Sequence, residues 1–125
     1  MMRFTWLLGV LSLTACASCP PAWSEAPPER VGFLHAAAGS GDTFVDANAE
    51  RVALIRATRQ IADELGLDVE RRLSVIHADG RLWVEALGPE GLVHDLDGLE
   101  LVSSVVCGDR TWVLVRLPWP PESGA

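Results

Sequence analysis

The segment from Thr43 to Leu65 constrains the fold most, because it is the longest part of the chain without a glycine or a proline. Such a segment predicts one long helix, since both residue types destabilise helix interiors. Asp42 before it is a good N-cap, and Asp46 and Glu50 suit the positive end of the helix dipole. Gly66, directly after it, is the residue type that commonly ends a helix. We therefore expect a helix from about Thr43 to Leu65.

This helix carries two apolar seams. The first occupies an arc of about 40° at about 100° per residue. It consists of Leu54, Ile61 and Leu65. The second lies nearly opposite in the first half of the helix and consists of Val45, Ala49 and Val52. One sheet cannot cover both, so either the chain's own tether or tail covers the second seam, or this seam is a surface for a partner or for self-association. In the second case the expected partner surface comprises Val45, Val52, Ile55 and Trp119.

The remainder predicts strands and turns. Glycine beside aspartate between alternating apolar residues favours hairpins at Asp79-Gly80 and at Gly108-Asp109-Arg110. The expected strands are residues 31–38, 69–77, 81–87, 99–107 and 111–117, and residues 88–98 form a loop with one helical turn at Leu92–Leu96. The predicted fold class is α+β, with one long helix packed on a small, mostly antiparallel sheet (strand, helix, hairpin, hairpin). Residues 31–118 form this single domain, followed by a proline-rich tail at 119–125.

The N-terminus predicts a signal peptide over residues 1–15. Arg3 precedes the apolar run Trp6–Leu13, which has signal-peptide length and is far shorter than the roughly 20 residues that cross a bilayer. Leu13-Thr14-Ala15-Cys16 then resembles the bacterial lipobox, whose cysteine becomes the first mature residue. The resemblance implies a diacylglycerol on the Cys16 thiol and an acyl chain such as palmitate on its amino group. The alternative is an ordinary secretory signal with an incidental cysteine.

Charge argues against two classes of partner. The chain has 10 basic residues, all arginine, against 17 acidic ones. Removal of residues 1–15 takes away Arg3, so the mature balance is 9 − 17 = −8. A protein that binds nucleic acid needs a basic surface, and electrostatic binding to anionic lipid needs clustered basic residues. The acidic composition therefore argues against both. Membrane contact is therefore expected from lipid, and Ala17 after Cys16, by analogy with lipoprotein sorting, favours the periplasmic face of the outer membrane.

Cys19 and Cys107 remain after lipidation of Cys16. In an oxidising compartment they either form a disulfide or stay as two free thiols. Residues 16–30 hold four prolines and predict a semi-extended tether. Trp23 in this segment either packs back on the domain or sits at the lipid interface.

No set of residues predicts catalysis. His94-Asp95-x-Asp97 offers too few ligands for a divalent cation, so neither a metal nor a cofactor is expected. Gly39-Ser40-Gly41 lacks both the Gly-Lys-Ser/Thr end of a phosphate loop and the hydrolase elbow around its serine. We therefore expect a protein that is not an enzyme.

Several features together resemble small bacterial lipoproteins of the LPP-twenty type, which are related to the N-terminal domain of flagellar protein T. They are the lipobox, Pro20-Pro21-Ala22-Trp23, Ala38-Gly39-Ser40 at a strand end, the Ala/Arg-rich segment 47–69 and the strand 111–117. The resemblance covers most of residues 20–117. It implies one helix packed on a small sheet, an envelope location and no catalytic residues. Residues 88–98 are short for the family, so a second family helix is missing or reduced.

These observations predict a non-enzymatic, lipid-anchored cell-envelope protein that binds another envelope component, such as a flagellar, cell-wall or secretion assembly. An alternative with a different kind of function is a small-ligand or metal-binding module, or a weak enzyme, that uses the 88–98 loop. A third reading is a purely structural spacer.

Overall fold

The computed structural model describes residues 19–41 and 47–120. The expected signal peptide, Cys16, Val45 and residues 121–125 of the tail lie outside the described residues, as does the expected start of the helix. The elements are η1 Ala22–Ser24, β1 Phe33–Gly39, α2 Ala47–Glu64, β2 Arg72–Ala78, β3 Arg81–Gly88, β4 Gly91–Leu92, β5 Glu100–Cys107 and β6 Arg110–Pro118.

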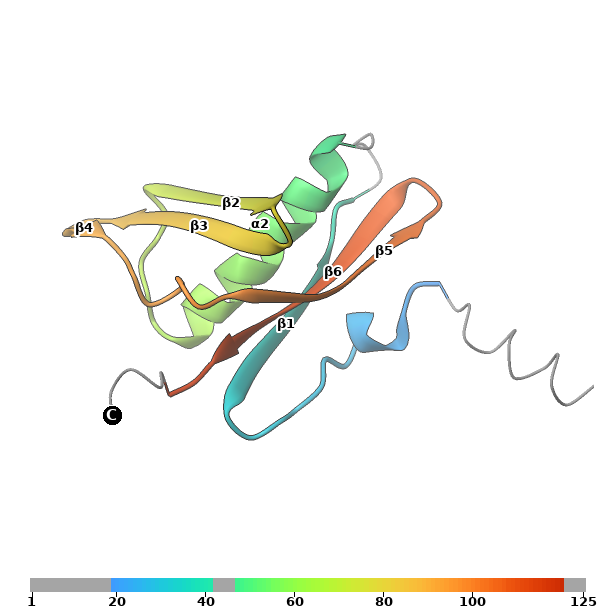
Figure 1. The fold of residues 1–125 in the computed structure, drawn as a ribbon, viewed down its shortest axis with the longest axis horizontal. Helices are drawn as coiled ribbons and strands as arrows, with labels where there is room; N and C mark the ends of the chain where they lie inside the picture. The colour runs from blue at the N-terminus through green and yellow to red at the C-terminus, as the bar shows by residue number, and fades with distance from the viewer. Residues whose placement is uncertain (1–18, 42–46, 121–125) are drawn as a thin grey trace, which may run out of the picture.

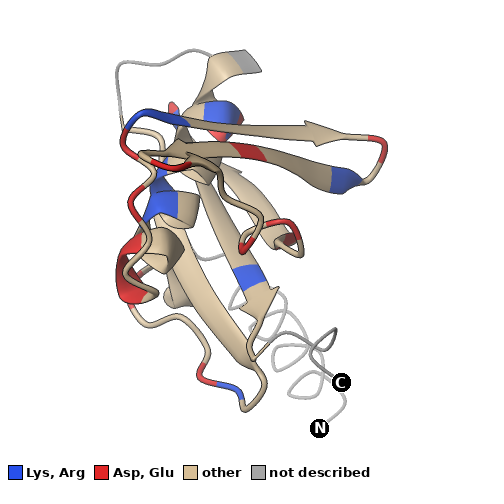
Figure 2. Cartoon of the chain, turned by 90° about the vertical axis from the view of Figure 1, so that its left-hand side faces the viewer, with Lys and Arg blue, Asp and Glu red and all other residues tan. Residues whose placement is uncertain are grey.

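The strands form two separate sheets. Sheet A has the order β1-β6-β5 and sheet B the order β2-β3-β4, and every neighbouring pair is antiparallel. α2 packs against β1 and β6 of sheet A and against β2 of sheet B (Figure 1). In Figure 2 the β2–β3 hairpin projects sideways while the strands of sheet A run downward, so the two sheets diverge from the helix.

The predicted fold of one long helix on a small sheet is therefore wrong, and so is the same fold implied by the family resemblance. The described chain is mostly β, with two three-stranded antiparallel sheets. Both predicted hairpins form, at Asp79-Gly80 and at Gly108-Asp109, but they do not join edge to edge. β6 instead pairs with β1 on its other side, and β3 pairs with β4. Each hairpin is specified locally by its turn, whereas the pairing between hairpins is set by distant segments.

Packing against two sheets explains the broad buried arc of α2. The first seam lies in the core, where Leu54 is 1% and Ile61 is 0% exposed. Fully buried small residues extend this arc on both sides, and they are Ala53, Ala57, Thr58 and Ala62. Of the second seam, Ala49 is buried and Val52 is half-buried. The helix thus packs against β1 and β6 of sheet A and, along another part of its surface, against β2 of sheet B.

α2 also caps the free edge of β1. Arg56 Nη1 donates to Gly39 O at 3.0 Å, and Gln60 Nε2 donates to Ala37 O at 3.1 Å. An edge strand otherwise presents unpaired backbone groups to other chains. Side chains on the polar flank of α2 therefore occupy acceptors that would favour edge-to-edge association.

The end of α2 and the first hairpin turn have the geometry their sequences predict. Gly66 has φ +72°, and Leu67 N donates to Ala62 O at 2.9 Å, which is the Schellman pattern of a helix C-terminus. Asp79 and Gly80 have φ values of 57° and 73°. Positive φ at both central residues is characteristic of a type I′ turn, whose twist matches that of the two strands of a β-hairpin.

The N-terminal segment covers the face of sheet A that points away from α2. Ala37 and Leu114 lie opposite each other on that face and are both buried. η1 packs against β1 and β6, with Trp23 half-buried, and Pro21 just before it is buried. Residues 19–24 thus lie against the sheet. The prolines of this segment instead predict a semi-extended tether.

A disulfide between Cys19 and Cys107 fastens this segment to the last residue of β5. The two Cα atoms are 5.7 Å apart and the residues are separated by 88 positions in the sequence. The bond therefore closes almost the whole described chain into one loop.

Candidate functional site

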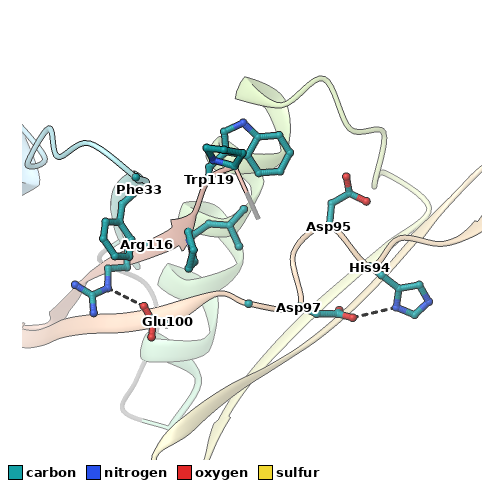
Figure 3. Close-up of a pocket in the computed structure, with 12 residues that line it drawn as sticks. Phe33, His94, Asp95, Asp97, Glu100, Arg116 and Trp119 are labelled. Carbon is teal, nitrogen blue, oxygen red and sulfur yellow. Dashed lines mark hydrogen bonds and ion pairs between the residues drawn. The ribbon is translucent and has the colours of Figure 1, made fainter. Parts of the chain in front are cut away.

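A groove opens at the end of sheet A that lies farthest from the disulfide. Its volume is about 960 Å³ (Figure 3). It is lined by residues of the 88–98 loop, by the first residue of β5, by the last residues of β6 and by the start of β1. The lining side chains used below are Phe33, His94, Asp95, Asp97, Glu100, Arg116 and Trp119.

Backbone hydrogen bonds and one buried leucine position the walls of the groove. Trp119 N donates to Gly32 O at 2.9 Å, which ties the residue after β6 to the residue before β1. Leu96 is fully buried, and Leu99 N donates to its carbonyl oxygen at 3.1 Å. The helical turn expected at Leu92–Leu96 does not form, because Leu92 pairs with Leu87 of β3 instead. The loop is therefore anchored at both ends.

Arg116 is held in one orientation by two neighbours. Its Nε donates to Glu100 Oε1 at 2.8 Å, across the pairing of β5 with β6. The centre of its guanidinium lies 4.7 Å from the centroid of the Phe33 ring. A guanidinium over an aromatic face gains about 0.5–1 kcal/mol at an exposed site. The groove thus presents a fixed cation beside an aromatic surface, as Figure 3 shows.

The opposite wall is acidic. His94 Nδ1 lies 3.0 Å from Asp97 Oδ2, and both side chains are exposed. Figure 3 shows Asp95 pointing away from this pair. The lining contains three carboxylates, on Asp95, Asp97 and Glu100, against the one guanidinium of Arg116. Across the described residues, no three histidine, cysteine or acidic side chains gather in a way that could hold a metal ion.

His35 lies beside Arg116 on sheet A, opposite it in the β1–β6 register. Burial lowers the pKa of His35, and the positive charges of Arg116 and Arg30 lower it further. Its Nδ1 is buried without a hydrogen-bond partner among the described groups. The neutral imidazole is therefore the form that the folded protein favours.

A second polar cluster joins the two sheets and does not have the geometry of a catalytic triad. Glu50 of α2 lies 3.0 Å from His77 Nδ1 through Oε1, and it accepts a hydrogen bond from Ser104 Oγ at 2.9 Å through Oε2. Ser104 donates to the carboxylate and not to the imidazole, so this contact gives the hydroxyl no imidazole base. The cluster links β5, α2 and β2.

The structure does not bring the predicted partner residues together. Trp119 lines the groove, whereas Val52 and Ile55 are half-buried on α2, and Ile55 packs against the core. Val45 and Cys16 lie outside the described residues.

Sequence reasoning missed Phe33, Glu100 and Arg116 as site residues. The alternation along residues 111–117 places Arg116 with Trp112 and Leu114 on one face. However, only the pairing of β6 with both β1 and β5 brings Phe33 and Glu100 to it.

Comparison with family models, with curated proteins and with solved structures finds no match for this chain. Within the part of the chain that the structure describes, no helix has the length and apolar character needed to span a membrane.

Proposed function

We propose that this protein is a non-enzymatic lipoprotein of the bacterial envelope, anchored through Cys16 to the periplasmic face of the outer membrane. Leu13-Thr14-Ala15-Cys16 supports the anchor, as does the resemblance to LPP-twenty lipoproteins. The Cys19–Cys107 disulfide supports an oxidising compartment, because disulfides persist there and are rare in the cytosol.

The composition of the groove supports the proposal that the domain binds another envelope component. It combines two aromatic side chains, Phe33 and Trp119, with an excess of carboxylates over guanidinium groups. Aromatic surface supplies contact area, and complementary charge selects the partner. The groove therefore suits a segment with apolar and basic side chains, contributed by a flagellar, cell-wall or secretion assembly.

Photo-crosslinking in intact cells tests this assignment. A photoreactive phenylalanine derivative replaces Asp95, an exposed residue of the groove, and in a matched control it replaces Glu70, an exposed residue outside the groove lining. We expect one discrete crosslinked species from position 95 and none from position 70. Adding Glu100→Arg should reduce its yield, because this change reverses a charge in the groove and removes the acceptor for Arg116. Equal crosslinking from both positions, or a yield unaffected by Glu100→Arg, contradicts binding at the groove.

One observation favours the alternative of a small-ligand or metal-binding module, or a weak enzyme, at the 88–98 loop. Residues of this loop also line two further hollows, with volumes of about 400 Å³ and 580 Å³. A ligand that binds the folded state raises the melting temperature. A thermal-shift screen with metabolites and divalent cations therefore tests this alternative, and a rise in melting temperature that Asp97→Ala abolishes would favour it.

A further inference from the structure

We infer that the anchored domain stands on the membrane with the tip of the β5–β6 hairpin against the phospholipid surface, so that the groove opens away from the bilayer. The inference rests on the proposed lipidation of Cys16. It adds a defined orientation and a membrane-facing surface, which follow from the position of the disulfide.

The disulfide shortens the tether to a few residues. Cys16 and Cys19 are three positions apart, and an extended chain spans at most about 3.3–3.6 Å per residue, so this link reaches about 11 Å. Without the disulfide, only the packing of η1 against β1 and β6 holds this segment. Once it detaches, the flexible link runs from Cys16 to Gly32 just before β1 and reaches more than about 50 Å. Only the short link holds one particular part of the domain at the membrane.

The disulfide lies at a specific end of sheet A. Cys107 is the last residue of β5, and the turn Gly108-Asp109 follows it directly. β1 also ends here, since Gly39 pairs with Trp112 near the start of β6. This end of sheet A therefore lies nearest to the expected lipid.

The groove lies at the other end of the same strands. Glu100 begins β5 and lines the groove, whereas Cys107 ends the strand. Seven steps of about 3.4 Å along an antiparallel strand separate them by about 24 Å. Phe33 at the start of β1 and Trp119 after β6 are likewise at this far end. A bilayer at the hairpin tip therefore leaves the groove accessible.

The tip itself suits a phospholipid surface. Val106 is 70% exposed there, beside the disulfide. The turn region has one carboxylate, on Asp109, and one guanidinium, on Arg110, so its formal charges balance. Contact with the headgroups therefore requires no cluster of cations, in agreement with the acidic composition of the chain.

Two native tryptophans can report the orientation. Trp112 lies near the tip and Trp119 lines the groove. Two single-tryptophan variants of the full chain keep one of these and have phenylalanine at the other mature tryptophan positions. Each is purified in lipidated form from membranes and reconstituted into phosphatidylcholine vesicles that carry a nitroxide on the headgroup, a short-range quencher of tryptophan emission. Circular dichroism and thermal unfolding check that both variants fold like the wild type.

We expect the Trp112 variant to lose most of its emission and the Trp119 variant to keep most of it. Adding Cys19→Ser with Cys107→Ser to each should remove this difference, because the long tether no longer selects one end. Equal quenching, or stronger quenching of Trp119, in vesicle-bound protein with an intact disulfide overturns the orientation while leaving the anchor in place. Protein that carries no acyl mass and does not float with the vesicles overturns the proposed anchor, and the orientation with it.

Discussion

Two side chains near the groove are strongly affected by their neighbours. His35 lies opposite Arg116 in the β1–β6 pairing, and its pKa is lowered by burial first, then by Arg116 and Arg30. Arg116 in turn is fixed by Glu100 and by the ring of Phe33. A change of charge at this end of sheet A therefore acts on both the stability of the domain and the groove.

The lowered pKa of His35 predicts a loss of stability in acid. In the unfolded chain this histidine titrates near its ordinary value of 6.5. The unfolded state then binds more protons than the folded state as the pH falls below about 6.5, so the free energy of unfolding decreases in that range. Urea denaturation at a series of pH values from about 7 to 5 should show a shallower decrease for His35→Gln than for the wild type. Identical slopes for the two proteins would contradict the assignment.

At the scale of elements, sequence patterns predict what is decided locally. Asp79-Gly80 and Gly66 require particular backbone angles, so the first hairpin and the end of α2 follow from a few adjacent residues. The division into two sheets does not follow from adjacent residues, because β1 pairs with β6, which lies near the other end of the described chain. α2 packs against both sheets, but the two seams of the helix do not predict that a second sheet exists.

Glu50 links strands of the two sheets through side-chain hydrogen bonds at the start of α2, so its loss should destabilise the fold. It interacts with Ser104 of β5 and His77 of β2, and about a third of its side chain is exposed. Glu50→Ala should lower the free energy of unfolding by about 1 kcal/mol, after allowance for solvent screening. Glu64→Ala is the matched control, because Glu64 is exposed at the negative end of the same helix and its removal should cost nothing. Equal effects of the two substitutions in urea denaturation would argue against the link.

For the whole molecule, the disulfide connects the fold to the proposed anchor. It holds the N-terminal segment over a face of sheet A that would otherwise expose Ala37 and Leu114. The sequence leaves Cys19 and Cys107 as the one possible pair but also leaves two free thiols as an open alternative, since spacing alone says nothing about distance in space. The groove could not be predicted from the sequence either, because it forms where β1, β5 and β6, which are distant in sequence, meet.

Removal of this bond should destabilise the whole domain. Cross-linking residues 88 positions apart restricts the unfolded chain strongly. Cys19→Ser together with Cys107→Ser should lower the free energy of unfolding by about 2–5 kcal/mol. Wild-type protein unfolded in a reducing agent should show a similar loss, and the double variant should show no further loss on reduction. Unchanged stability in both measurements would mean that the bond does not constrain the unfolded chain.

The intact mass of the protein extracted from membranes is the decisive measurement for the lipid anchor. We expect a chain that begins at Cys16, carries a diacylglycerol and an acyl group, and contains one disulfide. The Cys16→Ala variant should carry neither lipid. A chain that still begins at Met1, or one that begins at an unmodified Cys16, would mean that Cys16 is not a lipid anchor.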